Sequence, residues 1–586
     1  MVHKNDILSG KVQSFGSDGE GVVRVEDCTF FVPYALPGEE ISFRVLKIKG
    51  NTGYGKIEEI FTPSPRRRAP VCPVFKTCGG CCLQHAEYDL QTEFKREKVR
   101  GALKKIGGIE AEVLPVVPCS SPYEYRNKLQ LPVGVDANGN AVLGFYAERS
   151  HRIVPIGRCA LHPAWAERLM KAFKEYIAES GASAYDELTK KGLLRHLVAR
   201  EIDGNYLVTV VATEKRLPKS DVLIKKLRGI FPECSAFINV NDKDTNVIFG
   251  DKFYPLCGAG HIDGVSEGIR YEAGAETFVQ VNPEVREKLY RKALEECFAN
   301  GANVVIDAYS GGGLLTAMAA KRAKRAYGVE LNAEASACAE KLKEKNGLTN
   351  MINICGDVAE KLPEIMRKER AENTVLIVDP PRAGVARSVL YAILNSGIGR
   401  IVMISCNPAT LSRDLGILTG NLREENGALI KSMEKIDAEE NATAYVNENE
   451  RNSRYFNIER IEPYDMFPQT KHVETLVCLS KKSEKHISID VEFGESDGQI
   501  SLKKLQEELN EQKPKKKTTY KDIQAYIEEK YGFKVHTAYI AEVKRDLGLP
   551  MYDAPNAVEE LKRPRSHPTA EMSDAIKAAL KHFEII

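Results

Sequence analysis

The 586-residue chain has no apolar run approaching the roughly 20 residues that a membrane-spanning helix needs. Its first residues, Met1–Asp6, lack the apolar stretch of a secretory signal, so we expect a cytoplasmic protein. Net charge is lacking too: 83 basic and 82 acidic side chains leave +1, which excludes a globally basic nucleic-acid coat. In a reducing compartment the fourteen cysteines would not form a disulfide framework, so any clustered ones are expected to bind metal or to act in catalysis.

The length exceeds what one hydrophobic core supports, and the pattern along the chain indicates four parts. Residues 1–65 alternate short apolar runs with glycine turns, as in a small β-barrel of the OB type. Residues 66–265 read as a central α+β module, whose helix near 88–106 is expected to pack on the next domain. Residues 266–482 carry an α/β pattern, and residues 483–586 form an extension with a lysine-rich linker and two helices.

Two basic segments are candidates for phosphate contact. Arg66-Arg67-Arg68 follows the barrel, where a solvated linker is an equally good interpretation. Arg126, Asn127 and Lys128 open an alternating strand and are suited to phosphates or bases, or simply to an exposed strand face.

Four cysteines have the spacing of a metal site. Cys72, Cys78 and Cys81 follow a C-x5-C-x2-C pattern in a glycine-containing loop, and Cys159 is the candidate fourth ligand. Four thiolates hold either Zn²⁺ or a [4Fe–4S] cluster. The radical-type C-x3-C-x2-C spacing is absent, so a cluster here would be structural or serve RNA binding. Cys82 is the spare cysteine.

A nucleotide-binding pattern begins at Asn303–Gly313, where a buried strand runs into a glycine loop. Glu330 ends the next strand about 20 residues on, in position to accept bonds from ribose hydroxyls, and Asp357 and Asp379 end further strand-like stretches. The loop lacks the Gly-Lys-Ser/Thr tail of a P-loop, which favours a cofactor with an adenosine but no triphosphate.

Cys406 follows the apolar run Ile401–Ile404 and so stands at the strand end where α/β sheets bind ligands. A lone cysteine is more often a core thiol, and His472 or Glu474, at the mouth of a final strand, would each alone be an ordinary polar residue. The polar segment 434–454 is predicted to be a mobile loop.

Together these features resemble the S-adenosylmethionine-dependent RNA uracil-C5 methyltransferases, most closely the branch that acts on 23S ribosomal RNA and carries an iron–sulfur cluster. The likeness spans about residues 10–480, and the barrel resembles a TRAM domain. It rests on Phe31-Val32-Pro33, the four cysteines, Phe278–Asn282, Asp307–Gly313, Asp379–Arg382, Ser405–Pro408 and His472–Glu474. Departures are Ser310, where the family usually has cysteine, and the apparent additions 434–454 and 481–586.

The resemblance implies a class I methyltransferase Rossmann-like domain and a monomeric enzyme that methylates uridine in 23S ribosomal RNA. It also implies the roles of individual residues. Gln280, Tyr309, Glu330 and Asp379 would line the S-adenosylmethionine pocket, with Asp357 near the adenine; Cys72, Cys78, Cys81 and Cys159 would hold a [4Fe–4S] cluster; Cys406 would be the nucleophile and Glu474 the general base.

Uracil C5 is too weakly nucleophilic to be methylated directly, so a nucleophile must first add at C6, and a thiolate suits that task. We expect its surroundings to lower the pKa of Cys406, and a carboxylate to remove the C5 proton afterwards. The target base must leave its stack. Two alternatives remain: the same reaction on a transfer RNA uridine, and a non-catalytic RNA-binding or ribosome-assembly factor, which the presence of both Cys406 and Glu474 disfavours.

Overall fold

The computed structural model describes residues 2–136, 138–425, 428–431, 454–482, 520–547 and 567–583. The chain forms two compact units, Met1–His486 and Ile487–Ile586. The predicted loop up to residue 453 and the lysine-rich linker at 513–517 lie outside the described residues. In the parts that are described, no helix is both long and apolar enough to cross a membrane.

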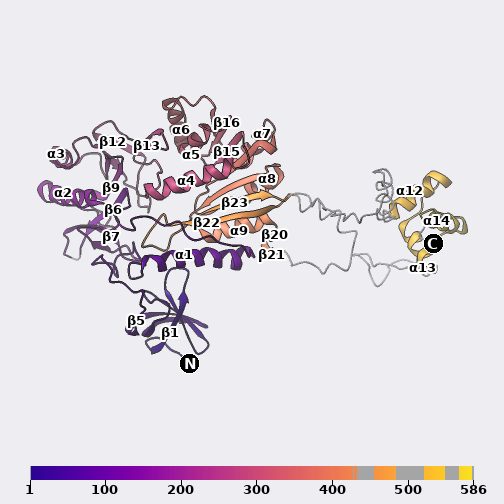
Figure 1. The fold of residues 1–586 in the computed structure, drawn as a ribbon, viewed down its shortest axis with the longest axis horizontal. Coiled ribbons are helices and arrows are strands. Elements are labelled where there is room, and N and C mark those ends of the chain that lie inside the picture. The colour runs from indigo at the N-terminus through magenta and orange to yellow at the C-terminus, as the bar shows by residue number, and fades with distance from the viewer. Residues whose placement is uncertain are drawn as a thin grey trace, which may run out of the picture. The chain divides into compact units, whose positions relative to one another are not determined.

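The N-terminal strands close into a barrel in the order β1-β2-β3-β5-β4, as the glycine-punctuated alternation predicts (Figure 1). Inward side chains such as Phe30 and Phe43 are fully buried and fill its centre. The strands are β1 (Ile7–Phe15), β2 (Gly21–Val25), β3 (Cys28–Val32), β4 (Glu40–Lys49) and β5 (Thr52–Thr62).

The arginines that follow the barrel are engaged in ion pairs. Arg67 binds the fully buried Glu39 through two N–O contacts of 2.6 and 2.7 Å. Arg66 and Arg68 both contact Glu87, just before helix α1 (Tyr88–Ala102). These side chains therefore attach the barrel to the segment that follows it. Because Arg67 is paired with Glu39, it is neither a free phosphate contact nor part of a solvated linker.

The central module is built on a seven-stranded sheet of order β12-β11-β10-β9-β6-β7-β8, with the β10–β11 pair parallel. Helices α2 (Ala164–Ser180) and α3 (Ser220–Ile230) contribute to its core. The strands are β6 (Lys128–Val135), β7 (Ala141–Tyr146), β8 (Ile153–Pro155), β9 (Leu194–Ile202), β10 (Asn205–Ala212), β11 (Ser235–Val240) and β12 (Lys252–Cys257). The hairpin β13 (Ile262–Ser266) and β14 (Ile269–Ala273) follows.

The next sheet has the order β17-β16-β15-β18-β19-β23-β22, in which β23 runs antiparallel to both neighbours. Strand order reverses at β15, the position where doubly wound sheets bind ligands. The strands are β15 (Val304–Ala308), β16 (Arg325–Glu330), β17 (Met351–Cys355), β18 (Thr374–Val378), β19 (Arg400–Ser405), β22 (Phe456–Tyr464) and β23 (Glu474–Lys481). A small pair, β20 (Leu422–Glu425) and β21 (Ala428–Lys431), lies outside it.

Helices cover both faces of this sheet because its central strands are apolar on both sides. Alternate residues divide between two cores: Val305 faces α4, α5 and α6, whereas Val304 and Ile306 face α7, α8, α9 and the end of α1. The helices are α4 (Pro283–Phe298), α5 (Leu314–Ala320), α6 (Ala333–Lys345), α7 (Val358–Met366), α8 (Arg387–Asn395) and α9 (Pro408–Thr419). The predicted α/β architecture is confirmed.

The second unit contains α12 (Tyr520–Tyr531), α13 (Thr537–Asp546) and α14 (Ala570–His582) around a core that includes Ile527, Ile540 and Ile576. The sequence predicted two helices in this extension. Helix α13 begins at Thr537 because His536 caps it through Nδ1, which accepts a hydrogen bond from Ala538 N at 3.2 Å.

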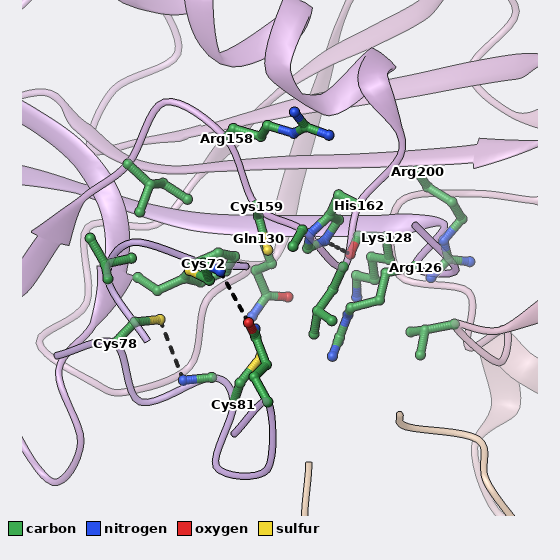
Figure 2. Close-up of a pocket in the computed structure, with 18 of the residues that line it drawn as sticks. Cys72, Cys78, Cys81, Arg126, Lys128, Gln130, Arg158, Cys159, His162 and Arg200 are labelled. Carbon is green, nitrogen blue, oxygen red and sulfur yellow. Dashed lines mark hydrogen bonds between the residues drawn. The ribbon is translucent and has the colours of Figure 1, made fainter. Parts of the chain in front are cut away.

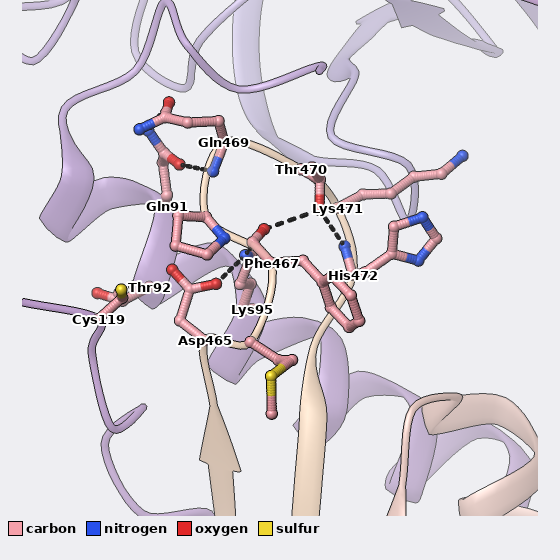
Figure 3. Close-up of polar contacts among 12 residues, drawn as sticks. Gln91, Thr92, Lys95, Cys119, Asp465, Phe467, Gln469, Thr470, Lys471 and His472 are labelled. Atoms are coloured by element: carbon pink, nitrogen blue, oxygen red, sulfur yellow. Dashed lines mark hydrogen bonds and ion pairs between the residues drawn. The ribbon is translucent and has the colours of Figure 1, made fainter. Parts of the chain in front are cut away.

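A buried ion pair joins helix α1 to the loop between β22 and β23 (Figure 3). The side chains of Lys95 and Asp465 are both fully buried, and Lys95 Nζ also donates to the Phe467 carbonyl at 2.9 Å. Beside them Gln91 exchanges two 3.0 Å hydrogen bonds with Gln469. Helix α1 thereby holds the loop that leads into Glu474, the first residue of β23.

Replacing Lys95 with Met is expected to lower the free energy of unfolding by about 3–5 kcal/mol, because it leaves the Asp465 carboxylate buried and unpaired. The matched control is Lys95→Met with Asp465→Leu, which removes both charges and is expected to recover most of the loss. Chemical denaturation of the three proteins measures this. Equal destabilisation of the single and double variants would contradict it.

Candidate active site

A cavity of about 960 Å³ opens at the carboxyl ends of β15, β16, β18 and β19. It brings together six of the seven predicted catalytic and cofactor residues, which come from separate segments of the chain. These are Gln280, Tyr309, Glu330, Asp379, Cys406 and Glu474. The strand ends at which the sequence places polar residues therefore surround a single cavity.

Cys406 and Glu474 meet across a strand pair. Strands β19 and β23 are antiparallel, with Ser405 opposite Thr475, so one residue further Cys406 comes opposite Glu474. Asn407 then caps α9 by accepting a hydrogen bond from Ala409 N at 3.1 Å, which ends the strand at this point. The thiol directly follows the last residue of β19 and the carboxylate belongs to the first residue of β23, so the pairing of these two strands places them next to each other.

The environment raises the pKa of Cys406 above that of an ordinary thiol, first by burial and then through the nearby Glu474. Arg382 acts in the opposite direction, through its charge and a hydrogen bond to the thiol. The expectation that the surroundings lower this pKa is therefore wrong for the free protein. The effect of burial on the pKa of Cys406 is larger than the opposite effect of the one nearby cation, Arg382.

Three carboxyl groups around the cavity bind protons more strongly than usual. Burial, followed by the charge of Asp379, raises the pKa of Glu474 well above its usual range. Burial also raises the pKa of Asp379 to about 7, with Asp307 as the second cause. Burial likewise raises the pKa of Asp307 to about 7, although Thr316 donates a 2.6 Å hydrogen bond to this carboxylate. Such clustering is typical of functional sites.

The glycine loop is shaped to approach a ligand. Gly311 N donates to Glu330 Oε2 at 2.9 Å, so this acid anchors the loop from the neighbouring strand. Tyr309 adopts a left-handed backbone with φ 65°, an uncommon conformation outside glycine that concentrates at functional sites. Gly313 has φ 81°, and a Cβ there would come within 2.7 Å of Ala339 Cβ. Only glycine fits this loop-to-helix junction.

Asp357, the seventh predicted residue, does not line this cavity. Its side chain caps α7 instead, with Oδ1 accepting a hydrogen bond from Ala359 N at 2.7 Å. A strand-ending acid followed directly by a helix is a common capping pattern, which competes with the ligand-binding interpretation.

Arg382 is the residue whose role the sequence reasoning did not assign. It lines the cavity and influences both Cys406 and Glu474. The sequence contained an indication of this role, because Arg382 directly follows Asp379-Pro380-Pro381 at a strand end, where a cation beside buried acids is unusual.

The four predicted metal-ligating cysteines line a second cavity, of about 450 Å³ (Figure 2). Cys72, Cys78 and Cys81 come from the loop before α1, and Cys159 from the segment after β8. Cys82 does not line it. Within the described residues, no three of these sulfurs lie mutually within 4.8 Å. A tetrahedral Zn²⁺ would hold them about 3.8 Å apart.

Comparison with known proteins identifies the family. Residues 262–444 match the family model of tRNA (uracil-5-)-methyltransferases. An uncharacterized RNA methyltransferase of Halalkalibacterium halodurans is 37% identical, covering 82% of this chain and 98% of the relative. One of Clostridium tetani is 36% identical, covering 83% of this chain and 98% of the relative.

Among solved structures, the Pyrococcus abyssi tRNA (uracil-54, C5)-methyltransferase in complex with S-adenosyl-L-homocysteine has a TM-score of 0.61 at 27% identity. The likeness covers 80% of this chain and 99% of the Pyrococcus abyssi chain. The chain therefore belongs to the family of S-adenosylmethionine-dependent RNA uracil-C5 methyltransferases.

Proposed function

We propose that the protein methylates C5 of a uridine in 23S ribosomal RNA, with Cys406 adding to uracil C6 and Glu474 removing the C5 proton. The observation that carries this is the placement of the thiol and the carboxylate on facing strand ends in one cavity beside the glycine loop. The choice of 23S RNA rests on the resemblance carried by the four cysteines.

The residues around the glycine loop fit S-adenosylmethionine. Glu330 stands at the end of β16, where an acid suits the ribose hydroxyls, and Gln280 is buried in the wall of the same cavity. A cavity of about 960 Å³ is large enough for both this molecule and a uracil base. When bound, S-adenosylmethionine supplies a methyl group on a sulfonium, which an enolate carbon can attack while the neutral thioether leaves.

The chain's own residues supply the remaining steps. The Cys406 thiolate forms a bond to C6, and the electrons of the C5–C6 double bond move toward the C4 oxygen. Asp379, about half protonated near neutral pH, is suited to donate a hydrogen bond to that oxygen. After C5 is methylated, the Glu474 carboxylate takes the C5 proton, the double bond re-forms and the thiolate leaves.

The cavity also sets a requirement for the RNA. Cys406 is about half-buried and Glu474 is 3% exposed, so a uracil stacked in a helix does not reach them. The target uridine must be unstacked or flipped into the cavity, as in other enzymes that react with a base.

We further propose that Cys72, Cys78, Cys81 and Cys159 hold a [4Fe–4S] cluster. Burial is the main reason that the pKa of Cys81 is raised to about 12 and that of Cys159 to about 11, so these thiols are neutral without a metal. Four partly buried thiols around one cavity fit a group that binds thiolates. Because no three of their sulfurs lie mutually within 4.8 Å, their spacing favours a cluster over zinc. Its role here would be structural or in RNA binding.

Transfer RNA is the second candidate substrate. The family model and the Pyrococcus abyssi structure both carry transfer RNA in their names, and the likeness covers the barrel as well as the catalytic sheet. The reaction and the catalytic residues would be the same.

Replacing Cys406 with Ala is expected to abolish the covalent complex with RNA containing 5-fluorouridine, because no thiolate then adds to C6. Replacing Glu474 with Gln is expected to slow turnover about 100- to 10,000-fold and to let an adduct with ordinary uridine RNA persist. Denaturing gels detect both. Cys338→Ala, which changes an exposed thiol at the same cavity, is the control and should behave as wild type. An adduct formed by Cys406→Ala would exclude this nucleophile.

The rate of methyl transfer is expected to rise with pH, by up to about tenfold per unit between about pH 6 and pH 7, and less steeply above pH 7, where Asp379 loses the proton that it donates to the C4 oxygen. The reactive forms are the Cys406 thiolate and the Glu474 carboxylate, and both pKa values are raised, so both forms gain population as pH increases. Single-turnover transfer from labelled S-adenosylmethionine measures this. A rate already constant from pH 6 would show a thiol with a lowered pKa.

Deleting the gene is expected to remove 5-methyluridine from one or more positions of 23S ribosomal RNA. Mass-spectrometric mapping of ribosomal and transfer RNA from the deletion strain measures this, with the plasmid-borne Cys406→Ala protein as the inactive control. Loss confined to transfer RNA would establish the second candidate. Unchanged methylation in both RNAs would refute the proposed function.

A further inference from the structure

The cavity with the four cysteines has a basic end. Figure 2 shows the cysteines on one side and Arg126, Lys128 and Arg200 grouped on the other. All three basic side chains line the cavity. The cavity is therefore built from two chemically different halves, and the cysteines account for only one of them.

The basic half contains an unfavourable strand pairing. Lys128 of β6 lies directly opposite Arg200 of β9 in an antiparallel pair, where like charges destabilise a sheet. Arg200 is 4% exposed, so water does not offset the repulsion. Burial and the two neighbouring arginines lower the pKa of Lys128 to about 8. Folding alone gives no reason to place these two cations together.

The protein does not neutralise these charges itself. Arg126, Lys128 and Arg200 form no ion pair with any described residue, and Arg126 Nε and Arg200 Nη1 have no hydrogen-bond partner. Arg158, which lines the same cavity, is by contrast paired with Glu124 and Glu167. A buried cation without a partner, such as Arg200, is costly, and together with the two partly buried cations beside it this indicates a bound anion.

The position of the basic half relates it to the active site. Thr277, Phe278, Val279 and Val281 line both this cavity and the one that contains Cys406. Phe278 is 77% exposed at the boundary, so a nucleic-acid strand that places a base beside Cys406 can pass over it toward the basic half. Phosphate is the anion that such a strand carries, and arginine binds it through paired N–H groups.

We propose that Arg126, Lys128 and Arg200 form a subsite for a backbone phosphate of the substrate RNA, next to the uridine that enters the cavity of Cys406. The proposal rests on the proposed function, because it assumes an RNA substrate. It assigns the basic half of the cavity to RNA positioning and leaves the cysteine half to the cluster. Neither sequence motif nor family resemblance places Arg200 in such a role.

The first test compares RNA binding by wild type, Arg200→Gln, Lys128→Gln and the control Arg158→Gln. The probe is an unmodified transcript, 23S fragment or transfer RNA, that the wild-type enzyme methylates, with S-adenosylhomocysteine present. Arg200→Gln and Lys128→Gln are each expected to bind at least about tenfold more weakly, with the salt slope reduced by about one. Arg158→Gln should bind within about twofold of wild type. Equal binding by all four proteins overturns the subsite.

A second test removes the charge from the RNA instead. A series of RNAs carries one uncharged methylphosphonate at each linkage flanking the target uridine. One linkage is expected to weaken binding by wild type about tenfold and to have no further effect on Arg200→Gln, since both changes remove the same contact. Additive effects at every linkage would refute the proposal.

Folding and metal content separate this role from two others. Removing one of two facing cations is expected to leave the melting temperature of Arg200→Gln and Lys128→Gln at or above that of wild type. A lower melting temperature with normal RNA binding would assign the residues to folding. Loss of iron and brown colour with an unchanged salt slope would assign them to the cluster. Both outcomes refute the subsite, whereas a wild-type protein that methylates neither RNA refutes the proposed function itself.

Discussion

The buried ion pair between Lys95 and Asp465 is the contact on which the geometry of the active site depends. It joins helix α1, which follows the barrel and the cysteine loop, to the loop just before Glu474. A buried ion pair contributes little net stability, but it fixes the relative position of its two partners because separating them leaves each charge buried and unpaired. The base and the nucleophile then keep their positions through the β19–β23 register. Helix α1, which lies far from the catalytic sheet in the sequence, thus positions β23, the strand that begins with Glu474.

Both cavities of this enzyme contain charged groups whose electrostatic environment is unfavourable. Asp307, Asp379 and Glu474 all hold raised pKa values in the methyl-transfer cavity, and Lys128 faces Arg200 in the neighbouring one. Functional sites commonly sacrifice stability in this way. The apolar cores on both faces of the catalytic sheet offset this cost, since every residue of β15, β18 and β19 is buried.

Local patterns in the sequence were sufficient for most elements. The glycine turns predicted the barrel, and apolar runs ending in acids predicted β15, β16 and β18. Capping was harder to separate from ligand binding, as Asp357 shows, because both place an acid after a strand. The third helix of the second unit, α14, was not predicted, and the Arg66–Arg68 run did not reveal that Arg67 binds a buried glutamate on the barrel.

The sequence by itself determined which residue types are available at the strand ends, because hydrophobic runs and the groups that follow them are local properties of the chain. It thereby determined the fold class and the pairing of Cys406 with Glu474 as candidates. Only the tertiary structure decided the electrostatics, because desolvation depends on neighbours that are distant in sequence. For this reason the pKa of Cys406 is raised where a lowered value was expected, and the unpaired Arg200 became visible only beside Lys128.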